Sequence, residues 1–170
     1  MTRLLLTAAT IVLAGLVAGA MFGIWLSGCP AALSPAAYVE HQQHAIRGLN
    51  VAMPVLGGVT AGLTLVQAVL ARPARRRAGL FAAAAVCFLG AGMVTRFRNQ
   101  PINAVVMTWA PDSPPADWAE LRDDWWWWHT VRTGLGVAGL ALAAAAGVRA
   151  GTGPRICAAH HSGEARCARD

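Results

Sequence analysis

Three separated segments of the chain carry side chains suited to acid–base chemistry beside groups that bind anions. A histidine titrates near neutral pH and can take a proton, and a carboxylate can orient it or act as a base itself. Arginine and asparagine side chains can stabilise an oxyanion that develops during a reaction. The candidate catalytic groups are His129, His41, Glu40, Arg132 and Arg47, and the candidate substrate-binding amides are Asn99, Asn103 and Asn50.

The segment RDDWWWWHTVR (residues 122–132) places four consecutive tryptophans beside this group. On a helix, one face is shared at i, i+3, i+4 and i+7 by Trp125, Trp128, His129 and Arg132. We expect Trp125 and Trp128 to face the protein interior and to bind a flat, lipophilic substrate. Trp126 and Trp127 point elsewhere, and we expect them at a membrane–water interface, which tryptophan favours.

A metal site is the alternative use of the same histidines. His41 and His44 stand at i and i+3 and can approach a shared ion, to which His129 would add a third ligand. A metal-free pocket and a metal centre therefore both stay open. No Gly-rich dinucleotide loop, P-loop, HExxH or nucleophile elbow occurs, so nucleotide-dependent and triad-hydrolase classes lack support.

The elements that must position these groups are transmembrane helices. Of the 170 residues, 56% are hydrophobic and 13% are charged, about half the charge of an ordinary soluble domain. Uncharged stretches cover 4–26, 48–71, 78–95 and 133–148, and about 20 apolar residues cross a bilayer. We predict an all-α bundle of four transmembrane helices over residues 1–150, followed by a disordered cytoplasmic tail over 151–170.

The distribution of arginine predicts the orientation of the bundle. All 14 basic residues are arginine, and those near the N-terminus, in the 72–77 connection and in the tail lie on one side. The other side carries six of the eight acidic residues. We therefore expect an integral protein of the cytoplasmic membrane. By the positive-inside rule, both of its termini should lie in the cytoplasm. The net charge of +6 thus reports topology, and no nucleic-acid partner is expected.

The second and fourth helices should extend beyond the bilayer on the outer side. Ser34 can cap a helix that Pro35 opens, and this helix should continue through the membrane with a kink at Pro54. The third helix should break near Asn99, before Pro101, and a short helix should follow toward residue 109. The fourth should begin at Pro114 after a Ser113 cap.

All the candidate site residues then lie at about one depth on the outer side. Ionisable groups at membrane depth are costly and by default mark a functional site. The alternative is that the arginines reach lipid phosphates and the histidines merely lie at the interface. We expect one cavity opening toward the outer half of the bilayer, formed by His129, His41, His44, Glu40, Arg47, Arg132, Asn99 and Asn103.

Several motifs of the chain resemble those of the anthrone oxygenase-like family of small four-helix membrane proteins. They are YVEHQ (38–42), RGLN (47–50) with Met53-Pro54, NQPIN (99–103), and Trp118 followed by LRDDW and WHTVR (121–132). The resemblance covers most of the chain and stops before the tail. Family members often carry Glu where this chain has Trp126.

The resemblance implies oxidation of an anthrone-type phenol, or another lipophilic small molecule, by O₂ without an organic cofactor. His129 or His41 would remove a proton from an activated CH₂ group, and Arg132 and Arg47 would stabilise the anion. The competing hypothesis is a non-catalytic membrane protein that binds a small molecule or metal, or serves as a partner subunit. Glycines Gly15, Gly19, Gly57, Gly58 and Gly62 are expected at close helix contacts, and no pattern specifies a homo-oligomer.

Overall fold

The computed structural model describes residues 1–27, 29–148, 157–158 and 166–167. Most of these residues are helical. The elements in chain order are α1 (Thr2–Leu26), η1 (Pro30–Ala32), α2 (Pro35–Leu49), α3 (Ala52–Leu70), α4 (Arg75–Val94), the π-helical η2 (Thr95–Asn99), α5 (Gln100–Val106), α6 (Trp118–Val148), β1 (Cys157–Ala158) and β2 (Arg166–Cys167).

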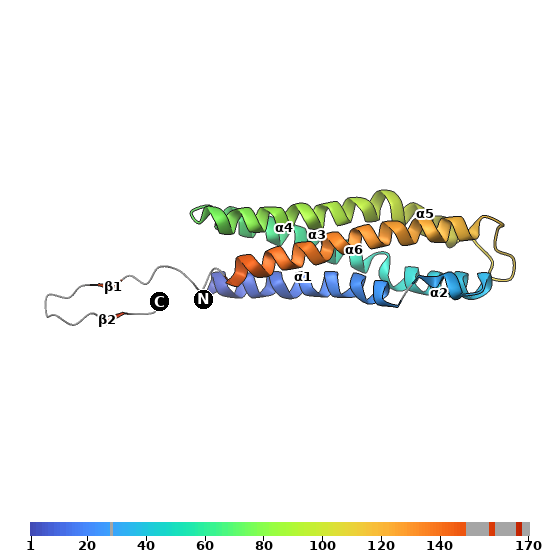
Figure 1. Cartoon of the computed structure of the whole chain (residues 1–170), viewed down its shortest axis with the longest axis horizontal. Coiled ribbons are helices and arrows are strands. Elements are labelled where there is room, and N and C mark those ends of the chain that lie inside the picture. Colours follow the sequence, from blue (N-terminus) through green and yellow to red (C-terminus); the bar gives the residue numbers. More distant parts are fainter. Residues whose placement is uncertain (28, 149–156, 159–165, 168–170) are drawn as a thin grey trace.

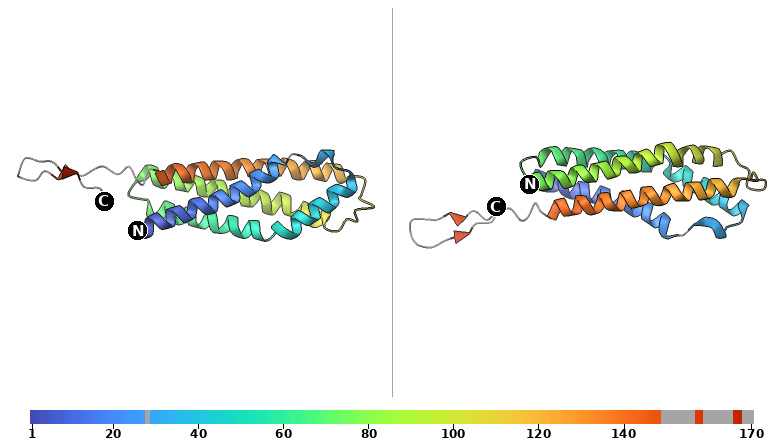
Figure 2. Two further views of the ribbon diagram at one scale, coloured as in Figure 1. Left: turned by 90° about the horizontal axis from the view of Figure 1, so that it is seen from below. Right: turned by 45° about the horizontal axis from the view of Figure 1, so that its top comes forward.

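Four long helices form the bundle, and the predicted fold class is confirmed. Among the described residues, four helical segments are long and apolar enough to cross a membrane, containing α1, α3, α4 and α6. Helix α6 packs against α1 and α4, and α3 packs against α4 and less extensively against α1. The start of α1, the α3–α4 connection and the end of α6 lie at one end, and α2 and α5 lie at the other (Figure 1). Helices α1 and α3 diverge toward the α2 end (Figure 2, left).

The second predicted helix is two helices, not one helix kinked at Pro54. The Ser34 hydroxyl caps α2 by accepting a 3.3 Å hydrogen bond from the Ala37 N–H, as expected. The helix ends at Leu49, and α3 begins at Ala52 with Pro54 in its first turn. A proline in a helix interior clashes with the carbonyl four residues earlier, here that of Asn50. Interrupting the helix at Asn50 and Val51 avoids this clash, and the axis of α2 then differs in direction from that of α3.

The predicted break near Asn99 is also absent. Both Asn99 and Gln100 have right-handed helical dihedral angles, so Gln100 is not extended before Pro101. The π-helical segment η2 inserts extra backbone before α5, in whose first turn Pro101 lies. Proline is tolerated in a first turn, and π segments recur at functional sites. The short helix predicted after Pro101 is present as α5 and ends at Val106.

Helix α6 begins at Trp118, four residues after the predicted start at Pro114. Pro115 follows Pro114 directly and disfavours a helical conformation for it, so residues 110–117 form turns instead. Over its 31 residues α6 is about 46 Å long, which exceeds a bilayer core of about 30 Å. The helix therefore carries the tryptophan tetrad into the bundle without a break, as predicted.

The glycines at close helix contacts are not those that the sequence suggested. A Cβ added at Gly15, Gly19, Gly57, Gly58 or Gly62 would meet nothing within 4 Å. On α6, by contrast, a Cβ at Gly139 would lie 2.9 Å from the Phe88 ring, and Gly136 contacts the Met21 side chain. Close packing is therefore concentrated along α6, where it meets α1 and α4.

The tail is described only at two short strands. Cys157–Ala158 pairs antiparallel with Arg166–Cys167, and Cys157 is opposite Cys167. The predicted disorder over 151–170 otherwise falls outside the described residues.

Candidate functional site

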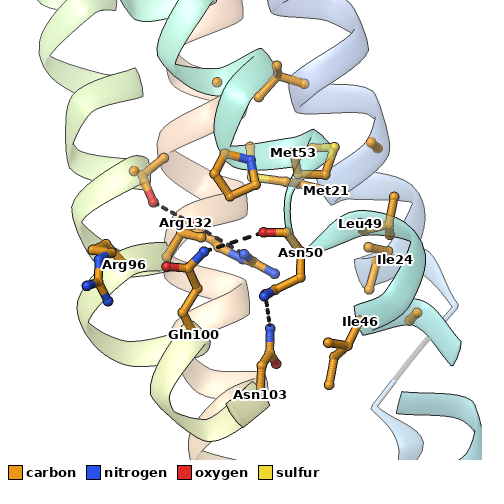
Figure 3. A pocket seen from close by; sticks show the side chains of 18 of the residues that line it. Met21, Ile24, Ile46, Leu49, Asn50, Met53, Arg96, Gln100, Asn103 and Arg132 are labelled. Atoms are coloured by element: carbon orange, nitrogen blue, oxygen red, sulfur yellow. Dashed lines mark hydrogen bonds between the residues drawn. The ribbon is translucent and has the colours of Figure 1, made fainter. Parts of the chain in front are cut away.

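A cavity of about 870 Å³ lies at the end of the bundle where α1 and α3 diverge. Its walls come from α1, α2, α3, the segment α4–η2–α5, and α6. Figure 3 shows Arg96, Gln100 and Arg132 on one side of this space and Ile24, Ile46 and Leu49 on the other, with Asn50 and Asn103 between them. The full set of polar lining groups is His41, Gln42, Asn50, Thr95, Arg96, Gln100, Asn103, Arg132 and Ser27.

Arg132 is half-buried and held in place from two sides. Its Nε donates to Nδ1 of His129 at 3.1 Å, and its Nη1 donates to the Thr95 hydroxyl at 3.2 Å. The guanidinium also lies 5.5 Å from the centre of the Trp125 ring. In the described part of the chain, the one ion pair joins Arg122 to Asp123, so the charge of Arg132 has no carboxylate partner there.

His129 is fully buried and lies behind Arg132 rather than on the cavity wall. Because Nδ1 accepts from Arg132, the ring proton is on Nε2, which donates to the Met21 carbonyl at 3.2 Å. The Trp125 ring stacks on the imidazole with centroids 5.0 Å apart. Both ring nitrogens are therefore engaged, and His129 positions Arg132 instead of facing a bound molecule.

An amide network continues from Trp125 to the break between α2 and α3. The indole N–H of Trp125 donates to Asn103 Oδ1 at 2.8 Å, and Asn103 Nδ2 donates to Asn50 Oδ1 at 2.9 Å. Gln100 Nε2 reaches the backbone carbonyl of Asn50 at 3.4 Å, the carbonyl that Pro54 leaves without a helical donor. Two side chains of α5 thus supply donors to Asn50 at the break before α3, and together these groups form one polar wall.

Asn99 supports this wall from behind. Its Nδ2 donates to the Trp125 carbonyl at 3.0 Å, and its side chain is fully buried. The Asn99 Oδ1 has no hydrogen-bond partner in the described residues. The asparagine therefore positions α6 against η2 and does not line the cavity.

Residues 43–142 of the chain match the family model described as anthrone oxygenase. The chain belongs to the anthrone oxygenase family. Comparisons with curated proteins and with solved structures gave no match. The matched range of this anthrone oxygenase family member contains the wall from Asn50 to Arg132, while His41 and Gln42 directly precede it.

Helix α2 presents a different face to the cavity from the one that the sequence suggested. Glu40, His44 and Arg47 share a face as predicted, but all three are exposed and none lines the cavity. The buried face of α2 is Tyr38, Val39, Gln42, Gln43 and Ile46. His41 lies at the boundary of the two faces, exposed yet lining the cavity. Burying apolar Val39 and Ile46 turns the charged stripe outward, because charged groups are the costliest to bury.

The predicted three-histidine metal site is not assembled. His44 faces outward on α2, whereas both ring nitrogens of His129 bond to protein groups on α6 and α1. Within residues 1–27 and 29–148, no three His, Cys, Asp or Glu side chains are placed to hold a metal ion. His41, His44 and His129 therefore do not fit a shared ion.

Trp126, not Trp128, joins Trp125 at the cavity. Trp128 is half-buried under the Arg98 guanidinium, 4.6 Å from its ring centre, while Trp127 is 62% exposed as predicted. The buried stripe of α6 is centred near His129, with Thr133 and Gly136 continuing it. At 100° per residue, Trp126 lies nearer that centre than Trp128 does.

Sequence reasoning missed the glutamines of the site. Gln43 Nε2 donates to the carbonyls of Val106 and Trp109 at 3.0 and 2.9 Å, which fixes the end of α5 against α2. Gln42 and Gln100 line the cavity. The signal that identifies Gln42 and Gln43 is their helical register with Tyr38, Val39 and Ile46, the large apolar residues of α2.

Proposed function

We propose that this membrane protein of the anthrone oxygenase family binds a lipophilic phenol of the anthrone type in the cavity lined by Arg132 and oxidises it with O₂. The observation that carries the proposal is the charge of Arg132. The guanidinium lines a largely apolar cavity, has no carboxylate partner among the described residues, and is oriented by His129 and Thr95. A fixed cation without a counter-ion favours an anion, and a phenolate or enolate supplies one.

The chemistry follows from the acidity of an anthrone. Removal of one proton from the ring CH₂ group leaves an anion whose charge lies largely on the carbonyl oxygen, where Arg132 stabilises it. The carbon then forms a bond to O₂, and the resulting peroxide anion takes back the proton from the base to give a hydroperoxide. Loss of water from the hydroperoxide gives the quinone, so that one oxygen atom stays in the product and the other leaves as water with both CH₂ hydrogens.

His41 is the base in this proposal, because it is the histidine on the cavity wall. His129, the other candidate, accepts a hydrogen bond at Nδ1 and donates at Nε2, so it has no lone pair free to take a proton. Arg96 replaces Arg47 as the second cation near the anion, since Arg96 lines the cavity and Arg47 does not. Trp125 and Trp126 provide flat walls for the rings.

The engagement of both His129 nitrogens also favours a second function, that of a non-catalytic small-molecule binder. With His129 unavailable, the exposed His41 is the one histidine lining the described cavity. A protein that only binds a phenolate needs the cation and the amides but no base. The two functions differ in whether O₂ is consumed and whether His41 matters.

The test is O₂ uptake by the protein in phosphatidylcholine nanodiscs with 1,8-dihydroxyanthrone, compared with empty nanodiscs. Oxidation predicts uptake of one O₂ per quinone formed, and a loss of about 100-fold or more in kcat for His41→Ala. His44→Ala is the matched control, because His44 lies on the same helix outside the cavity, and it should leave the rate unchanged. Uptake no faster than in empty nanodiscs, with anthrones of varied substitution, contradicts the proposed oxidation and supports the binder.

A further inference from the structure

The cavity has two chemically different parts. Its polar groups come from Ser27 after α1, from α2 and the following Asn50, from η2 and α5, and from Arg132, all toward the α2 end of the bundle. From there the lining continues toward the middle of the bundle as an apolar arm. The arm is lined by Val17, Met53, Gly57, Gly58, Ala61, Phe88, Leu89 and Gly92.

The cavity also exceeds what a three-ring phenol fills. Its volume of about 870 Å³ is near the upper end of the roughly 300–1,000 Å³ typical of ligand pockets. A compact ring bound at the Arg132 end leaves the apolar arm unfilled. The arm reaches the surface of the bundle, because Leu89 on its wall is 55% exposed, as is the neighbouring cavity residue Met93 at 59%. In a bilayer this surface meets lipid chains.

Gln42 gives the polar part an unused hydrogen-bonding group. Its side chain is 4% exposed and lines the cavity, and it makes no side-chain hydrogen bond within the described residues. An amide that lines a cavity without a protein partner can bond to a ligand or to water there. The amide presents both a donor and an acceptor, which suits the hydroxyl and carbonyl oxygens of an aromatic head.

The apolar arm is kept open by glycines that have no packing role. A Cβ added at Gly57, Gly58 or Gly92 would meet nothing within 4 Å, yet all three line the cavity. Glycine destabilises a helix interior relative to alanine. Close helix contact does not account for that cost here, so the missing side chains leave space along the arm.

We propose that the ligand is an amphiphile resident in the membrane, with an oxygenated aromatic head bound by Gln42 and Arg132 and an apolar chain lying along Gly57, Gly58 and Gly92. The assignment of the head to an oxidisable phenol rests on the proposed function, whereas the head-and-chain arrangement does not. The chain can enter the arm from the lipid side, because lipid and the arm are equally apolar.

The experiment measures binding of two stable probes by quenching of tryptophan fluorescence in phosphatidylcholine nanodiscs. One probe is 1,8-dihydroxyanthraquinone, and the other is the same ring bearing a decyl chain. Gly58→Leu fills the arm and should weaken binding of the decyl probe about tenfold or more, while binding of the bare ring changes less than about twofold. Gly62→Leu is the matched control on the same helix, open to the surroundings and outside the cavity, and should leave both probes unchanged.

Two further variants keep the test decisive. Gly92→Leu narrows the arm from α4 and should reproduce the selective effect if Gly58→Leu fails to yield monodisperse protein. Gln42→Leu removes the amide and should weaken both probes about fivefold. Equal weakening of both probes by the glycine variants, no weakening at all, or no binding of either probe to the wild type overturns the proposal.

The proposed function fails separately. If the glycine variants selectively lose binding of the decyl probe while the wild type takes up no O₂, the amphiphile site is supported and the proposed oxidation is contradicted. If the wild type takes up O₂ with the bare anthrone while the glycine variants weaken both probes equally or not at all, the oxidation is supported and the amphiphile site is contradicted.

Discussion

The imidazole Nδ1 of His129 accepts a 3.1 Å hydrogen bond from Nε of Arg132, one turn further along α6. The bond fixes the tautomer of the histidine and the direction of the guanidinium together. It makes the fully buried His129 a positioning residue for the cation that lines the cavity.

Arg132→Gln should abolish most anthrone oxidation. Replacing the cation removes the group that stabilises the anion, and loss of such a donor costs about 100-fold or more in kcat. O₂ uptake measures the effect. Arg98→Gln is the control, because Arg98 is exposed over Trp128 and does not line the cavity. An Arg132→Gln protein with near wild-type uptake would show that the anion is stabilised elsewhere.

His129→Ala should destabilise the bundle by about 3 kcal/mol, because it leaves Arg132 Nε without its partner, removes a second hydrogen bond to the Met21 carbonyl of α1 and empties a buried site. Unfolding of the detergent-purified protein in denaturant provides the measurement. His44→Ala, at an exposed position on α2, should change stability by less than about 0.5 kcal/mol. Equal effects would mean that the His129–Arg132 pair is not formed.

The tryptophan tetrad should divide by position. Trp125→Ala should cost about 3–5 kcal/mol, because Trp125 is 7% exposed, stacks on His129 and donates to Asn103. Trp127→Leu should be nearly neutral, since Trp127 is 62% exposed. Thermal unfolding of the two variants separates these expectations, and comparable losses at both positions would contradict the orientation of α6.

Tyr38 should make the protein less stable above pH 10. Burial raises the pKa of Tyr38 to about 12, and its hydroxyl has no partner in the described residues. Between pH 10 and 12 the unfolded chain loses this proton while the folded chain keeps it, so stability falls by at most about 1.4 kcal/mol per pH unit. Tyr38→Phe should lack this part of the pH dependence and be no less stable at pH 7. Because Tyr38 is the single tyrosine, tyrosinate absorbance follows its titration directly, and a midpoint near 10 would refute the burial effect.

Gly139→Ala should destabilise the bundle, because the added methyl group would lie 2.9 Å from the Phe88 ring. The expected cost is about 1–3 kcal/mol from overpacking. Gly62→Ala is the matched change at an open helical position and should be neutral or stabilise by up to about 1 kcal/mol. Chemical unfolding compares the two, and a stabilising Gly139→Ala would contradict the close α4–α6 contact.

The uncharged stretches determined the bundle by themselves. A segment such as the apolar part of α1 or α3 has few alternatives to a membrane-spanning helix, because lipid offers its backbone no hydrogen bonds. The cap at Ser34 and the short helix α5 were equally local and therefore predictable. The break between α2 and α3 was not predictable, because Pro54 permits either a kinked helix or a new one. The contact of Gln100 with the Asn50 carbonyl, which only the tertiary structure brings together, favours the new helix.

The residue types of the site were also present in the sequence, but their directions were not. Arg132, Asn50, Asn103 and Trp125 share one wall because η2, α6 and the α2–α3 break meet in space. Glu40, His44 and Arg47 share a helical stripe just as regular, and it faces outward. Periodicity specifies which side chains share a face, whereas the packing of Val39 and Ile46 against the rest of the protein determines which face is buried.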